Sequence, residues 1–156
     1  IIMVAIIMIV SVVVLSRYEI GGDSFTVKRA AHQMAQDLRE AKEMSISVRN
    51  LSGSVPIGGY GVRLETGQKS YIIFADNDGS GSYSTGDEII NQVEMEKDVF
   101  IQSIDSGSPL NIVFIPPHPE VIIDPSPPGE YVTITLYFGG ITKKVIVNDA
   151  GLIKVE

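Results

Sequence analysis

The chain contains no cysteine and comparatively few positive charges. Without cysteine it can form no disulfide, no thiolate metal site and no cysteine nucleophile. Lys and Arg number 12 against 19 Asp and Glu, which gives a formal net charge of -7 at pH 7. A chain this acidic is repelled by phosphate backbones, so nucleic acid is not an expected partner. We expect the fold to be held by apolar packing alone.

Motifs that carry catalytic chemistry are also missing. The chain has no G-x-S-x-G nucleophile elbow. His32 and His118 lie far apart in the sequence and have no partners at ligand spacing. The glycine-rich run 58–61 lacks the preceding strand and the following helix that a phosphate-binding loop needs. We therefore assign no catalytic residue and expect the protein not to be an enzyme.

Apolar residues are concentrated at the start of the chain. Residues 1–15 read IIMVAIIMIVSVVVL, and the first charges are Arg17 and Glu19. As an α-helix this run is roughly 22 Å long. A helix that spans a bilayer needs about 20 apolar residues, so the run is slightly too short. A signal peptide would need a basic start, and a buried strand is rarely so long. We favour a helix over residues 1–20, in a membrane or in the core of a filament.

A second, amphipathic helix is predicted over residues 24–48. Its apolar residues recur at spacings of three and four, which is typical of a helix with one face on a core. Gly21 and Gly22 precede it, and paired glycines interrupt helical propensity. Asp23 or Ser24 is a suitable N-cap. The sequence therefore predicts two helices with a break at the paired glycines.

The remainder of the chain, residues 60–156, has the pattern of antiparallel strands. A hairpin is expected around Gly67, because β-type runs flank a short glycine turn. The proline-rich segments 115–119 and 124–129 are expected as surface connections, since proline cannot continue a strand ladder. The expected fold class is α+β: a long N-terminal helix, hydrophobic and then amphipathic, packed on an antiparallel β-sheet head formed by residues 21–156.

Three sequence motifs resemble a known family. Residues 30–41, AAHQMAQDLREA, resemble the L-A-x-x-L-R-x-A-R helix of pilins and pseudopilins of the GspH/FimT type. Residues 61–64, GVRL, are similar to the G-V-x-F strand of that family. Residues 74–81, FADNDGSG, together with 86–88, GDE, resemble its F-x-D-x-x-G-x-x-x-x-G-D-E hairpin. The layout of helix followed by strands is that of type IV pilins and type II secretion pseudopilins.

The resemblance implies a structural subunit of a type IV pilus or a pseudopilus. Such a chain sits in the inner membrane before assembly and then polymerises, with copies of itself or other pilins, into an extracellular filament. Gly21 and Gly22 are similar to the stretch where pilin helices can unwind, although a static loop is an alternative. The filament core would be formed by apolar side chains of the first helix: Ile6, Ile9, Val10, Val13 and Val14.

The chain departs from the pilin pattern at its start. Mature pilins begin with a methylated Phe or Met and carry a Glu at the fifth position, and neither is present. Aligning the apolar run with the family suggests that roughly six residues precede Ile1, which would complete the ~20 residues of a membrane span. We expect the intact mass of the filament subunit to exceed the mass of this sequence.

One acidic hairpin is a candidate calcium site. Asp76, Asp78 and Ser80 supply oxygen donors at alternating positions, and Asp87 and Glu88 follow, an order that resembles the first half of a calcium loop. No helix is expected on either side of it. Aspartate, glycine and serine are also the usual residues of a plain turn. Both interpretations remain open, and apart from calcium no cofactor is expected.

A function from a different class is a membrane-anchored extracytoplasmic binding module. In that case the first helix is only an anchor, and the proline-rich loops or the acidic hairpin hold a ligand. FimT-type DNA-uptake pilins carry a basic G-R-x-R motif near the C-terminus. Residues 151–154 read GLIK and keep a single positive charge at that place. DNA is therefore not expected as a partner.

Overall fold

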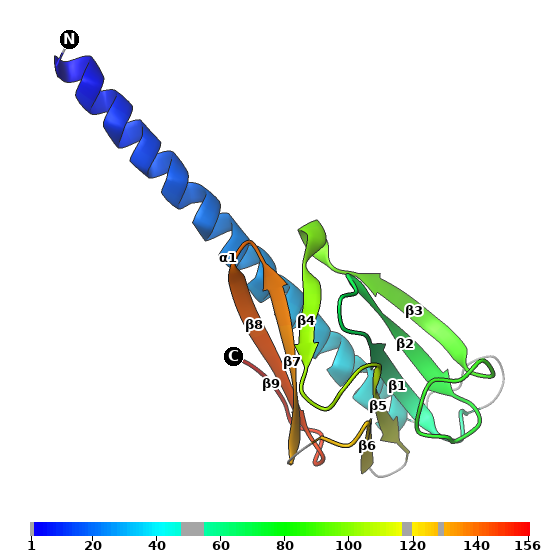
Figure 1. The fold of residues 1–156 in the computed structure, drawn as a ribbon. Coiled ribbons are helices and arrows are strands. Elements are labelled where there is room, and N and C mark those ends of the chain that lie inside the picture. Colours follow the sequence, from blue (N-terminus) through cyan, green and yellow to red (C-terminus); the bar gives the residue numbers. More distant parts are fainter. Residues whose placement is uncertain (1, 48–54, 117–119, 128–129) are drawn as a thin grey trace.

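The structure, a computed structural model, describes residues 2–47, 55–116, 120–127 and 130–156 (Figure 1). Along its helix, side chains are described for residues 3, 6–8, 10, 11 and 22–46. The class is α+β, with one helix packed on antiparallel sheets, as the sequence predicts. The helix extends well beyond the sheets at its N-terminal end (Figure 1).

Helix α1 (Ile2–Ile46) is a single element of 45 residues. The predicted break is wrong, because Gly21 and Gly22 both lie within the continuous helix. A glycine costs only about 1 kcal/mol relative to alanine inside a helix. Once a helix has nucleated, each added residue contributes its own hydrogen bond. Long helical segments on both sides therefore stabilise the helical conformation of the two glycines. Thr26 also donates a hydrogen bond of 3.0 Å to the carbonyl of Gly22.

The strands form two antiparallel sheets rather than the single sheet expected. The first has five strands in the order β3-β2-β1-β5-β6 and the second has four in the order β4-β7-β8-β9. A short 3-10 helix, η1 (Glu96–Asp98), joins β3 to β4. The strands are β1 (Gly59–Leu64), β2 (Ser70–Asp76), β3 (Glu88–Glu94), β4 (Phe100–Ile104), β5 (Leu110–Ile115), β6 (Glu120–Asp124), β7 (Tyr131–Phe138), β8 (Ile141–Asn148) and β9 (Ile153–Val155).

The core lies between α1 and the inner faces of both sheets. On the helix side, the predicted apolar stripe is confirmed from Val27 to Ala41, whereas Ile46 near its end is 50% exposed and Val48 lies outside the described residues. Alternate residues of β7 face the helix, because strand side chains point to opposite faces in turn. The buried helix residues are Val27, Ala30, Ala31, Met34, Ala35, Leu38, Ala41 and Met44. Four alanines in this set let the helix lie close to the sheets.

The predicted hairpin around Gly67 is present between β1 and β2. Val62 pairs with Ile73 in an antiparallel register. A second tight turn, at Gly139 between β7 and β8, lies against the helix. Its φ of +57° suits glycine, and an added Cβ would lie 2.5 Å from the carboxylate of Asp23. This turn therefore lies against α1 at Asp23, beside the start of its packed part.

Candidate functional site

Two features of the molecule are candidates for function: the projecting part of α1 and the acidic hairpin. We call residues 2–22 of α1 the stalk, and the sheets with the packed part of α1 the head (Figure 1). The stalk carries exposed apolar side chains with no covering from the head, namely Met3, Ile6, Ile7, Met8 and Val10. Met3 is 79% exposed and Ile7 is 65% exposed.

The sequence-predicted filament-core residues are on this stalk. Ile6 and Val10 are exposed large hydrophobic residues. Ile9, Val13 and Val14 belong to the helix, and their side chains lie outside those that the structure describes. Within the described part of the chain, no helix combines the length and apolar character needed to cross a bilayer. Contiguous exposed apolar surface of this kind is typical of interaction sites.

Four polar contacts tie the second half of α1 to the head, and we call them the four ties. They hold the helix direction fixed relative to the sheets, since they act on different turns of the helix. The side chains of Arg39 and Lys42 donate to the carbonyls of β9 and its preceding turn. The ties are Arg29 with Glu96 (3.0 Å), Tyr71 with Asp37 (2.5 Å), Arg39 with the Ile153 carbonyl (3.0 Å) and Lys42 with the Gly151 carbonyl (3.0 Å).

The tie between Tyr71 and Asp37 is the most buried of the charged contacts to the helix. Tyr71 is a buried residue of β2 and its hydroxyl donates to the Asp37 carboxylate. Burial raises the pKa of Asp37, the hydrogen bond from Tyr71 opposes that rise, and nearby Glu40 adds to it. Burial, and then the hydrogen bond to Asp37, raise the pKa of Tyr71 as well. The phenol therefore stays protonated and remains a donor.

The acidic hairpin brings three of the predicted ligands together. Carboxylate oxygens of Asp76, Asp78 and Asp87 lie within 4.8 Å of one another. Glu88 begins β3, pairs with Ala75 and is not part of this group. The Ser80 hydroxyl donates instead to the carbonyl of Ser82. In number and type the three carboxylates suit a hard cation such as calcium, which takes oxygen ligands.

Hydrogen bonds within the loop also satisfy these carboxylates. Buried Asp76 accepts from the backbone N–H groups of Gly79 (2.7 Å) and Gly81 (2.8 Å). Burial raises its pKa, and these hydrogen bonds act against the rise. Hydrogen bonds from Ser80 lower the pKa of Asp78 to about 2. Asp87 accepts from two backbone N–H groups, those of Asn77 and Ser84. The geometry therefore fits both a cation site and a self-contained turn.

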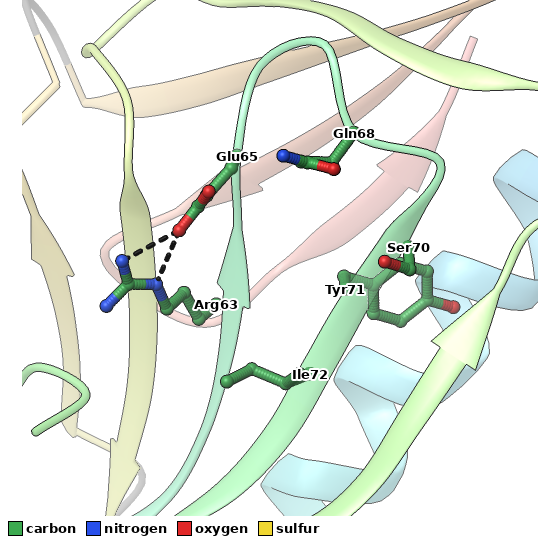
Figure 2. A pocket seen from close by; sticks show the side chains of 6 residues that line it. All are labelled: Arg63, Glu65, Gln68, Ser70, Tyr71 and Ile72. Carbon is green, nitrogen blue, oxygen red and sulfur yellow. Dashed lines mark hydrogen bonds and ion pairs between the residues drawn. The ribbon is translucent and has the colours of Figure 1, made fainter. Parts of the chain in front are cut away.

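A small pocket of about 170 Å³ opens between β1 and β2 (Figure 2). No local sequence pattern predicted this pocket. The guanidinium of Arg63 is held by Glu65, with 2.7 Å between Nη2 and Oε1, and lies 5.3 Å from the ring centroid of Tyr83. The charge of Arg63 is thus already matched. The pocket is lined by Arg63, Glu65, Gln68, Ser70, Tyr71 and Ile72. This set pairs no nucleophile with a base.

Comparison of the chain with protein-family models, with curated proteins and with solved structures finds no match. The observed class is α+β with one helix on antiparallel sheets. The resemblance to pilins, and everything that it implies, stays a prediction that depends on the sequence motifs.

Proposed function

We propose that this chain is a structural subunit of a type IV pilus or a pilus-like pseudopilus and polymerises through its stalk. The observation that carries the proposal is the form of α1. One continuous helix is packed on the head over its second half, and exposes large apolar residues, including Ile6 and Val10, over its first half. A monomer that is stable in water rarely exposes a contiguous apolar surface of this kind.

Association of stalks offers a physical reason for the exposed residues. Burying one large apolar side chain is worth about 1.5–3 kcal/mol, and five such residues are exposed between Met3 and Val10. In lipid, helices associate through close packing and hydrogen bonds rather than through the hydrophobic effect. We propose that the stalk rests in the inner membrane before assembly, and that neighbouring stalks then replace the lipid.

The four ties support a mechanical role for the helix. A helix fixed to its head on several turns passes force from the filament core to the exposed sheets without bending at a joint. The described side chains lining the pocket at Arg63 form no catalytic set. The proposal is therefore a structural protein of the cell surface, with an exposed head and no chemistry of its own.

Electron microscopy of producing cells, with gold-labelled antibodies against the head, tests this function. We expect label along filaments that extend from the cell. A membrane-anchored binding module is the competing function, and it would give label spread over the cell surface without filaments. That pattern would contradict the proposal.

A further inference from the structure

On the outer face of α1, turned away from the sheets, the described side chains are left uncovered by the head. Ile7, Phe25 and Glu43 follow at spacings of 18 residues, about five full helical turns, so they lie on one face. All three are exposed, and Phe25 is 69% exposed although it lies beside the head. Among the described side chains, the outer face is apolar at Ile7 and Phe25 and polar at Glu43.

The polar part of the outer face carries exposed charged residues that form no ion pair. The charged helix residues of the four ties are engaged by the chain's own head. In the described part of the chain, Lys28, Glu40 and Glu43 are exposed and form no ion pair. A free positive charge thus lies near the stalk, and two free negative charges lie roughly 18–22 Å further along the helix. The outer face is complementary to a shifted copy of itself.

We propose that a second copy of this chain binds the outer face in parallel, shifted by about 12 residues or ~18 Å, with Lys28 of one copy against Glu40 of the next. This inference rests on the proposed function and adds the register of the subunits. A separation of 12 residues turns the helix by about 120° beyond full turns, so the two charges lie on opposite flanks. The contact joins unlike surfaces, and such heterologous contacts continue into open filaments.

The stalk selects the parallel arrangement. An antiparallel pair could also match Lys28 with Glu40, but its two stalks would point in opposite directions and leave Met3, Ile7 and Val10 uncovered. In the parallel arrangement the neighbour's stalk runs alongside and its residues 10–16 come level with Phe25. The neighbour then covers Phe25 and pairs its Lys28 with Glu40, while Lys28 of the first copy pairs with a third copy on the opposite flank.

The absence of cysteine makes a direct test possible. A Lys28→Cys, Glu40→Cys double variant places both thiols on the exposed outer face. Within one chain these positions lie ~18 Å apart along the helix, whereas a disulfide needs Cα atoms within about 7 Å. Any bridge therefore joins two copies. We expect oxidation of assembled full-length chains to give a ladder of cross-linked oligomers. The control is Lys28→Cys with Ser47→Cys, also exposed, which should give none.

Charge reversal provides a second readout. Lys28→Glu or Glu40→Lys alone should raise the concentration needed for polymerisation roughly fivefold, and combining them should restore the parent value. Cross-linking that stops at dimers would indicate antiparallel pairs and overturn the proposal. Filaments with neither ladder nor rescue would overturn the register and leave the proposed function intact. A parent chain that forms no filaments at all would overturn both.

Discussion

Two truncations on the same helix separate folding from assembly. Leu38 is 0% exposed and faces the core, whereas Ile7 projects from the stalk. Replacing a buried leucine by alanine costs about 2–5 kcal/mol, which lowers the Tm of a domain of this size by roughly 5–20 °C. Truncating an exposed side chain changes the free energy of unfolding by at most about 0.5 kcal/mol. We therefore expect the Tm of Leu38→Ala to lie well below that of the parent, and the Tm of Ile7→Ala to equal that of the parent.

The two variants should rank in the opposite order in a polymerisation assay, with Ile7→Ala the more strongly impaired. If neighbouring copies bury Ile7, cutting it to alanine removes about 2 kcal/mol from each contact, which raises the critical concentration about 30-fold. The assay is sedimentation over a concentration series, alongside thermal melts of detergent-solubilised monomer followed by circular dichroism. An Ile7→Ala chain that polymerises at the parent concentration would refute the reasoning. So would a Leu38→Ala chain with an unchanged melt.

Three further outcomes are expected. Gly22→Ala should raise helicity and stabilise α1 by about 0.5–1 kcal/mol, because an added Cβ meets nothing within 4 Å; a loss of helicity would contradict a continuous helix. Because burial raises the pKa of Asp37, protonation stabilises the fold at low pH, and that contribution is lost as the pH rises through the raised pKa. The Tm of Asp37→Asn should therefore equal that of the parent near pH 3 and exceed it at pH 7. The reverse order of Tm values would contradict a raised pKa for Asp37. If the acidic hairpin holds calcium, calcium in excess over chelator should raise the Tm of the parent but not that of Asp87→Asn; equal Tm values for the parent in both conditions would show that the loop is a plain turn.

Local patterns were sufficient to predict the packed half of α1. Met34, Leu38 and Ala41 were expected on the buried stripe and are buried, because their spacing follows the helical repeat. The break predicted at Gly21 and Gly22 is absent. The low helix propensity of two glycines is outweighed by the cooperativity of the long helical segments on either side.

Pairing between strands could not be read from the sequence. The strand segments were visible, yet β4 pairs with β7, with Phe100 opposite Tyr137, while the intervening β5 joins β1. These choices depend on how both sheets pack against one helix, which is a long-range property. The contact between Arg63 and Tyr83 arises in the same way and had no local signal.

The acidic hairpin was predicted in part. Its turn residues indicated a cluster of oxygen donors, and Asp76, Asp78 and Asp87 do converge. Glu88 was expected with them but starts β3 in register with Ala75. Where the strand begins decides which of two adjacent acidic residues joins the cluster, and boundaries of that kind are the least certain part of a sequence-based prediction.

Sedimentation of the full chain beside a version lacking residues 2–20, in the same buffer without detergent, tests the role of the stalk most directly. We predict that the full chain forms large polymers, while the shortened chain sediments as a folded monomer with the circular dichroism of the head. Two chains that sediment alike, whether both polymerise or both stay monomeric, would contradict the account.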